Sequence, residues 1–176
     1  MGKRPARCYT KISGPANTRT KKYVRGVPGS KIVMFDMGNK SKDFPVQIHL
    51  INLEQCQIRH MALEAARQAV NRWLQKRIGR DGYHFRIRIH PHHILRENKM
   101  MAFAGADRMQ DGMRRSFGKP TDRSARVDAN SEILSVGIEP RHYKTAIFSL
   151  EKAISKLPTP AKVVVGKGKE LVKNIK

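Results

Sequence analysis

Residues Tyr83–His90 read YHFRIRIH, and this stretch decides how we interpret the fold. Apolar and polar side chains alternate along it, which is typical of a β-strand with one buried face. The apolar set is Tyr83, Phe85, Ile87 and Ile89, and the polar set is His84, Arg86, Arg88 and His90. Two arginines side by side on one face repel each other unless an anion lies between or over them. We therefore interpret the polar face as a phosphate contact, with screening of the arginines by solvent as the alternative.

The segments on either side of this strand carry further regular patterns. Short apolar runs predict strands at 31–37, 46–53, 133–138 and 162–165. Apolar residues at three- and four-residue spacing predict one helix within 57–78 and a second at 141–157, which Pro158 stops. The expected apolar faces are Ala62, Ala65, Ala66, Ala69, Val70, Trp73 and Leu74 in the first helix, and Ala146, Ile147, Leu150, Ala153, Ile154 and Leu157 in the second. We assign Trp73 to the core rather than to a base-stacking platform, because it lies on the apolar stripe.

The charge of the chain bounds the class of its partner. Lys and Arg number 36 against 14 Asp and Glu, a net charge of +22 over 176 residues. Such an imbalance lowers the stability of a free compact protein, and a polyanion such as RNA or DNA relieves it. An anionic membrane fits less well, because no long apolar span or strongly basic amphipathic helix is present. Acidic protein partners are a weaker alternative.

The excess charge is unevenly distributed, which predicts a domain with a binding face and basic extensions. Residues 1–35 hold nine basic residues and no acidic one, whereas residues 128–160 hold four of each. We expect residues 1–30 to form an extended basic arm that stays disordered until RNA neutralises it. Residues 31–165 would form a single domain with a long functional loop at 101–117, and residues 166–176 a flexible lysine-rich tail. The middle of the chain is rich in Arg, whose planar fork suits phosphate and base contacts.

Motifs for catalysis or cofactor binding are missing from the sequence. The chain has neither a dinucleotide-binding nor a phosphate-loop glycine motif. His90, His92 and His93 match no zinc spacing, and Pro91 interrupts them, so we expect no metal and no cofactor. Two distant cysteines and no apolar leader favour a reduced, intracellular compartment. Known RNA modules are also absent, and aromatic residues make up only 6%, so we expect recognition of RNA shape and backbone.

Five motifs together resemble one protein family over about residues 3–165. They are RPARCY near the start, RGVPGSKI at 25–32, LEAARQAVNRW in the first helix, FRIRIHPHHILRENKM at 85–100 and AGADRMQDGMRRSFGKP at 104–120. The chain resembles the archaeal and eukaryotic ribosomal proteins called ten-e, the counterpart of bacterial large-subunit protein sixteen. The chain ends soon after its last predicted strand, without the long C-terminal extension of eukaryotic members, which favours an archaeal source.

The resemblance implies a fold and a place in the ribosome. The fold would be an α+β two-layer sandwich of the hammerhead type, with two helices packed on a mixed sheet. The place would be on large-subunit ribosomal RNA, between the central protuberance and the stalk base, near the aminoacyl-tRNA path. In relatives the loop that matches residues 101–117 reaches toward the peptidyl transferase centre and tRNA. Arg115 adds a charge where we expect a small residue in eukaryotic members.

The expected function is therefore that of a structural, non-enzymatic component of the large ribosomal subunit. The expected partners are ribosomal RNA, tRNA near the loop and neighbouring large-subunit proteins, in the cytoplasm, with no membrane and no homo-oligomer. The expected RNA-binding residues are Arg4, Arg7, Lys21, Lys22, Arg25, Arg86, Arg88, Arg96, Lys99, Arg114, Arg115, Lys119, Arg123 and Arg126. The expected tRNA-proximal residues are Met101, Asp107, Arg108, Gly112, Met113 and Phe117.

Two other functions compete with this interpretation. A free DNA-compacting protein or RNA chaperone would have the same charge but would not stay with the large subunit through washing. A small nuclease is the alternative from another class, because Asp107 and Asp111 are four residues apart and could share a helical face. Both aspartates have arginine neighbours, so an ion-pair role explains them more simply.

Overall fold

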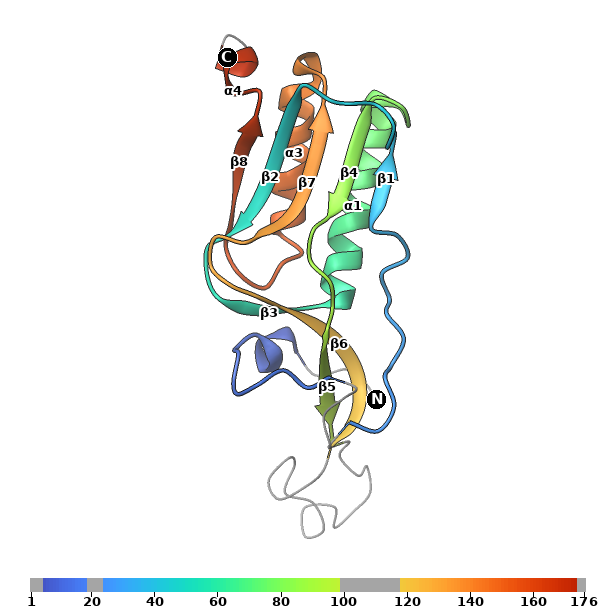
Figure 1. The fold of residues 1–176 in the computed structure, drawn as a ribbon, viewed down its shortest axis with the longest axis vertical. Helices are drawn as coiled ribbons and strands as arrows, with labels where there is room; N and C mark the ends of the chain where they lie inside the picture. Colours follow the sequence, from blue (N-terminus) through green and yellow to red (C-terminus); the bar gives the residue numbers. More distant parts are fainter. Residues whose placement is uncertain (1–4, 19–23, 99–117, 174–176) are drawn as a thin grey trace.

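The computed structural model describes residues 5–18, 24–98 and 118–173, which form an α+β fold with two antiparallel sheets (Figure 1). The elements in chain order are η1 (Ala6–Tyr9), β1 (Asp36–Gly38), β2 (Val46–Asn52), β3 (Cys56–Arg59), α1 (His60–Ile78), β4 (Tyr83–Ile87), β5 (His93–Glu97), β6 (Lys119–Val127), β7 (Glu132–Ile138), η2 (Pro140–His142), α3 (Tyr143–Ile154), β8 (Ala161–Lys167) and α4 (Lys169–Lys173). The first sheet has the order β1-β4-β7-β2-β8 and the second has the order β3-β6-β5.

Three segments of the chain run through both sheets. Strand β4 leads into β5, β6 leads into β7, and β2 leads into β3. The second sheet therefore continues the three middle strands of the first (Figure 1). The chain bends between the sheets, where the Asn52 N–H donates to the Ser131 carbonyl (3.0 Å) and the Asn130 N–H donates to the Asn52 carbonyl (2.8 Å). Asn130 has a φ of 63°, a left-handed conformation that asparagine tolerates better than most residues. A register shift between Leu50 and Ile51 lies beside it, as expected where a paired strand changes direction.

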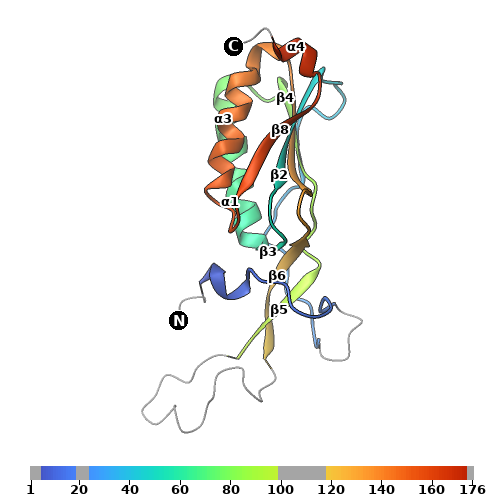
Figure 2. The ribbon, with the colours of Figure 1, turned by 90° about the vertical axis from the view of Figure 1, so that its left-hand side faces the viewer.

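Helices α1 and α3 cover one face of the five-stranded sheet (Figure 2). The alternation predicted for Tyr83–His90 is confirmed over β4, since Tyr83, Phe85 and Ile87 are buried. The same face of the sheet receives Val46, Ile48 and Leu50 from β2, and Leu134, Val136 and Ile138 from β7. From α1 the core receives Leu63, Ala66, Val70 and Leu74, and from α3 it receives Ala146, Leu150 and Ala153. No helix of the described residues lies on the opposite face of the sheet (Figure 2).

The helix predictions hold in position but not in every residue of the buried stripe. Helix α1 begins at His60, because residues 57–59 already belong to β3. Leu63 belongs to the buried stripe of α1, although we did not predict it. Ala65 and Trp73, which we expected in that stripe, are exposed and half-buried respectively. The assignment of Trp73 to the core is therefore wrong: its ring lies at the edge of the helix pair, against Phe148.

Several strand expectations also differ from the structure. The sheet is not mixed, because every pairing between described strands is antiparallel. The strand predicted at 31–37 is reduced to Asp36–Gly38, and the second sheet was not predicted at all. The predicted tail boundary at 165 lies too early. Strand β8 continues to Lys167, and Val172 of α4 is buried in the core.

The described parts of the N-terminal segment, residues 5–18 and 24–30, lie against the second sheet. The Gln57 N–H on β3 donates to the Thr10 carbonyl (2.8 Å), and the Ile94 N–H on β5 donates to the Asn17 carbonyl (2.9 Å). Because β3 and β5 are the outer strands, the segment covers backbone groups at both edges of this sheet. These contacts differ from our expectation of an arm without structure until RNA binds.

Side chains of the second sheet and of α1 also hold this segment. Arg123 Nε donates to the Pro28 carbonyl (2.6 Å), and Arg126 donates from NH1 to the Gly14 carbonyl (2.6 Å). The His93 Nδ1 accepts a hydrogen bond from the Asn17 N–H (2.9 Å). The His60 Nδ1 accepts one from the Lys31 N–H (3.2 Å), and its Nε2 lies 3.3 Å from Asp122 Oδ1.

The contact between His93 and Asn17 predicts a loss of stability in mild acid. Burial, followed by the charges of Arg126, His92 and Arg96, lowers the pKa of His93 from 6.5 to about 4. The folded pKa lies below the unfolded value, so the contribution of neutral His93 is complete above pH 6.5 and is lost as the pH falls through about 4. We expect the free energy of unfolding, measured in urea, to fall between pH 7 and pH 4.5.

The matched variant is His93→Asn, whose side-chain oxygen keeps an acceptor near the Asn17 N–H but does not titrate. It should be less stable at pH 7 and should lose less stability between the two pH values than the wild type. His92→Asn, at an exposed position, should keep the wild-type pH dependence. Equal pH dependence in wild type and His93→Asn would contradict the assignment.

Candidate nucleic-acid interface

The helix-free face of the five-stranded sheet carries a trough along its middle strand. On this face the middle of β7 presents the small residues Ser135 and Gly137, whereas β4 contributes His84 and Arg86 and β2 contributes Gln47. The register sets Arg86 opposite Ser135, and His84 opposite Gly137. Longer side chains on both neighbouring strands therefore form the walls of a trough, and Phe44 packs against Gly137 on its floor. We call it the open-face trough.

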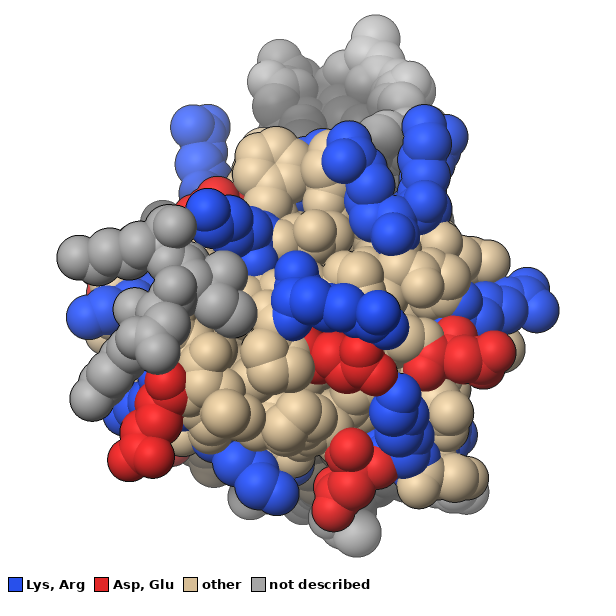
Figure 3. Space-filling view, turned by 90° about the horizontal axis from the view of Figure 1, so that it is seen from above, with Lys and Arg blue, Asp and Glu red and all other residues tan. Residues whose placement is uncertain are grey.

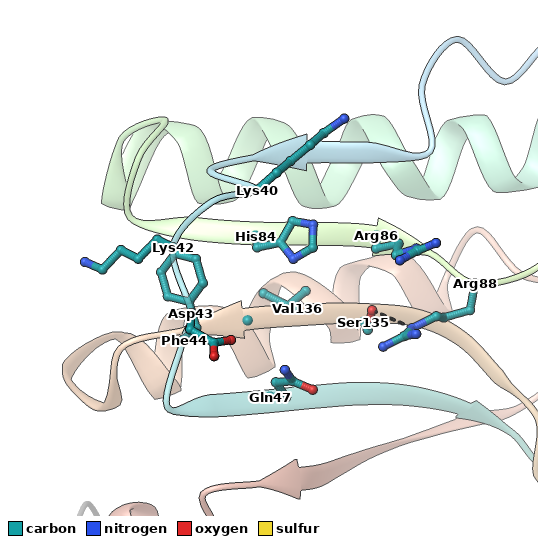
Figure 4. A pocket seen from close by; sticks show the side chains of 11 residues that line it. Lys40, Lys42, Asp43, Phe44, Gln47, His84, Arg86, Arg88, Ser135 and Val136 are labelled. Carbon is teal, nitrogen blue, oxygen red and sulfur yellow. Dashed lines mark hydrogen bonds between the residues drawn. The ribbon is translucent and has the colours of Figure 1, made fainter.

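The open-face trough encloses a cavity of about 280 Å³. Its lining residues are Lys40, Lys42, Asp43, Phe44, Gln47, His84, Arg86, Arg88, Ser135, Val136 and Gly137. In Figure 4 the helices lie behind the sheet, while His84, Arg86 and Arg88 follow one another along the near side. Four of the lining residues are Lys or Arg and one is Asp, so the cavity is positively charged.

Carboxylates within the chain explain how the two arginines of YHFRIRIH share one face. Arg86 Nε lies 3.4 Å from Asp36 Oδ1, and Arg88 Nε lies 3.7 Å from Glu132 Oε2. Arg88 Nε also donates to the Ser135 hydroxyl at 3.0 Å. Asp36 and Glu132 thus supply negative charge beside the two arginines, an explanation that we did not weigh from the sequence. The side chains of Arg86 and Arg88 nevertheless remain 52% and 40% exposed, and such exposed ion pairs contribute little, so both arginines can bind a phosphate.

The end of the trough beside Lys42 also contains ion pairs. Lys42 Nζ lies 2.6 Å from Glu139 Oε1, and Arg141 NH2 lies 2.8 Å from Glu139 Oε2. The hydrogen bond from Lys42 lowers the pKa of Glu139, so this carboxylate stays charged. Figure 3 looks onto the end of the molecule at which α4 lies, and Lys and Arg project from it with Asp and Glu between them. Cations and carboxylates are thus paired at both ends of the trough.

Comparison with known proteins shows which family the chain belongs to. A family model described as "Ribosomal protein L16p/L10e" matches residues 12–164. The chain belongs to this family. It is 50% identical to "Large ribosomal subunit protein uL16" of Archaeoglobus fulgidus over 173 residues, 98% of both chains.

Other archaeal relatives agree with this membership. The identity is 51% over 164 residues with the protein of the same name from Staphylothermus marinus, 93% of this chain and 94% of the relative. It is 49% over 174 residues with that of Methanococcus aeolicus, 99% of this chain and all of the relative. The resemblance that we drew from the sequence motifs is confirmed. Membership of the L16p/L10e family makes the chain a structural component of the large ribosomal subunit and not an enzyme.

Among the described residues that we predicted to bind RNA, Arg86 and Arg88 lie together in the trough. Arg7 and Arg25 are exposed in the N-terminal segment, and Lys119 is exposed at the start of β6. Arg96 is half-buried on β5, while Arg123 and Arg126 contact backbone carbonyls of the N-terminal segment. The predictions for Arg4, Lys21, Lys22, Lys99, Arg114 and Arg115, and for the loop residues Met101, Asp107, Arg108, Gly112, Met113 and Phe117, lie outside the described residues.

The three histidines of the HPHH motif have separate neighbours. The His90 ring stacks on Phe35 with centroids 4.3 Å apart, and His92 Nδ1 lies 3.1 Å from the His90 carbonyl oxygen. His93 contacts Asn17 instead. Within residues 5–18, 24–98 and 118–173, no group of three or more His, Cys, Asp or Glu is placed to hold a metal ion. In the same residues no helix is long and apolar enough to cross a membrane.

Sequence reasoning missed the residues that complete the trough. Lys40 and Lys42 belong to the turn after β1, and they come beside His84 only because β1 pairs with β4. The polar run NKSKD at 39–43 is a turn signal, but it does not say which strand lies next to it. Ser135 and Gly137 alternate with the apolar residues of β7, and this period of two could have marked them as the floor.

Gly38 is the position on which the turn that carries Lys40 and Lys42 depends. Its φ is 83°, and a Cβ there would overlap the Tyr83 carbonyl oxygen. We expect Gly38→Ala to lower the free energy of unfolding by roughly 1–3 kcal/mol, the cost of a strained left-handed residue. Urea unfolding measures this loss. Gly29→Ala is the control, because a Cβ there meets nothing within 4 Å and it should change stability little. Equal stability of the two variants would show that the turn adapts without cost.

Proposed function

We propose that the chain docks on large-subunit ribosomal RNA with the open-face trough against the RNA backbone. The observation that carries this proposal is the exposed Arg86–Arg88 pair on the wall of a cationic cavity, on the sheet face without helices. Arginine forks bind phosphate oxygens through two parallel hydrogen bonds. The net charge of +22 adds an attraction that does not depend on RNA sequence.

The trough suits a nucleic-acid backbone better than a small free anion. Its basic side chains are Arg86 and Arg88 along one long wall and Lys40 and Lys42 in the turn at one end, so they follow a line rather than converge on one point (Figure 4). A phosphodiester chain presents negative charges in such a line. Gln47 and Ser135 add polar groups that can bond with sugar or phosphate oxygens.

Finer features of the proposal follow from the family resemblance. We propose that the loop at 101–117 extends toward tRNA near the peptidyl transferase centre, and that it shapes the tRNA-binding region during translation. The remaining predicted contacts, from Arg4 to Arg126, would add phosphate partners elsewhere on the chain. The one-sided helix layer supports the hammerhead description of the fold, and the basic N-terminal segment would act as an extension of the domain of residues 31–165.

Removing both trough arginines should weaken RNA binding and reduce its salt dependence. If six to ten phosphates are contacted, affinity for isolated ribosomal RNA should fall by roughly 10³ to 10⁵ between 50 and 200 mM salt. In Arg86→Gln/Arg88→Gln the slope of log affinity against log salt should decrease by about 2, one unit for each lost phosphate contact. Filter binding over a range of salt concentrations measures both quantities.

Arg141→Gln is the matched control for this experiment. Arg141 is 72% exposed and does not line the trough, so the wild-type slope should persist. A flat salt response of the wild type would contradict the electrostatic basis of the proposal. An unchanged slope in the double variant would contradict the role of the trough.

Deleting residues 103–113 tests the proposed role of the loop. The trough and the N-terminal segment lie outside the deletion, so we expect the variant to join large subunits. tRNA accommodation on those subunits should be impaired, because the segment that would reach the tRNA is gone. Sucrose-gradient sedimentation measures incorporation and a reconstituted translation assay measures accommodation. Normal translation by subunits that carry the variant would contradict the loop's role.

A further inference from the structure

A pair of aromatic rings lies on the helix layer, on the side of the sheet opposite to the open-face trough. Trp73 of α1 and Phe148 of α3 meet with ring centroids 4.9 Å apart and planes inclined at 47°. Trp73 is half-buried and Phe148 is 45% exposed. The core beneath them is already filled by residues such as Val70, Leu74 and Leu150. Phe148 therefore exposes part of its side chain in addition to joining the helices through Trp73.

Basic side chains surround this pair. Lys152 Nζ lies 3.5 Å from the centroid of the Trp73 ring and 4.8 Å from that of Phe148. The Arg77 guanidinium carbon lies 4.7 Å from the Trp73 centroid. Between residues 65 and 80 the sequence has five Lys or Arg and no Asp or Glu. Cations beside aromatic rings are favourable by themselves, and they also give the patch a strong positive charge.

We propose that Trp73 and Phe148 form a second RNA contact, at which an unpaired base stacks on the exposed rings. Lys152 and Arg77 then turn to the phosphates on either side of that base. The choice of RNA as the partner rests on the proposed function. A neighbouring protein is the competing occupant of an exposed aromatic patch. The absence of acidic residues along 65–80 favours the polyanion, because a protein partner would need an unusually acidic surface to match it.

The two contacts would do different things. The open-face trough attracts backbone charge, whereas stacking on an aromatic ring depends on the face of a base and releases no counterions. Because the trough and the aromatic pair lie on opposite sides of the sheet, two RNA segments would hold the domain between them. This arrangement would fix the orientation of the domain on the RNA as well as its position.

Substitutions of Phe148 test the stacking contact in the full chain. Stacking of one base is worth about 1–3 kcal/mol, so Phe148→Leu should weaken binding to large-subunit ribosomal RNA by about 5- to 100-fold. This loss of affinity should be the same at 50 and 200 mM salt. The loss caused by removing Arg86 and Arg88 should instead depend on salt. Phe148→Tyr keeps a ring and should bind as the wild type does. The side chain is half exposed, so both variants should fold.

The fluorescence of Trp73 reports on the same site, because the chain has no other tryptophan. Ribosomal RNA should quench it at saturation, whereas polyphosphate, which neutralises lysines but has no bases, should not. Wild-type affinity in Phe148→Leu, or equal fluorescence with RNA and polyphosphate, would overturn the inference and leave RNA binding by the trough intact. Loss of a neighbouring subunit protein from Phe148→Leu ribosomes, with RNA affinity unchanged, would assign the patch to a protein partner instead. Failure of the wild type to bind RNA would overturn the proposed function itself.

Discussion

The bend shared by three strands is the constraint on which the rest of the structure depends. At Asn52, Asn130 and Ser131 the backbone turns from one sheet into the other, while backbone hydrogen bonds between neighbouring segments continue. The bend separates a half that is covered by helices from a half that is covered by the N-terminal segment. Because the helices occupy one face of the first half only, the other face keeps its polar side chains, and the trough lies there.

Features with a local sequence period could be predicted, and features that depend on distant partners could not. The alternation of Tyr83–Ile87 and the helical spacing of Val70 and Leu74 reflect geometry within a single element, and both predicted buried residues correctly. Strand β6 reads KPTDRSARV, whose charges mask any strand pattern, because its arginines bond with the N-terminal segment instead of facing solvent. The trough needs the register of four strands, and the carboxylates near Arg86 and Arg88 lie about fifty residues away in the sequence. The prediction for Trp73 failed because the stripe of α1 centres on Leu63 and Val70 rather than on the alanines.

Net charge measures attraction to RNA, but it overstates the number of cations that can contact it. Arg67 forms two short hydrogen bonds with Glu64, and this pairing lowers the pKa of the glutamate. Arg123 and Arg126 donate to carbonyl groups of the N-terminal segment. These arginines stabilise the shape of the binding surface, while Arg86 and Arg88 remain exposed on it. The same residue type thus serves the fold in one place and the interface in another.

The contacts of the N-terminal segment also impose an order on assembly. A ribosome makes residues 5–18 first, yet their partners on the second sheet include Gln57, Ile94 and Arg126. The bond between Gly14 and Arg126 joins residues 112 positions apart, so it cannot form until most of the chain has been synthesised. Until then this basic segment has no sheet to lie on. The residues that leave the ribosome first are therefore among the last to reach their place in the folded protein.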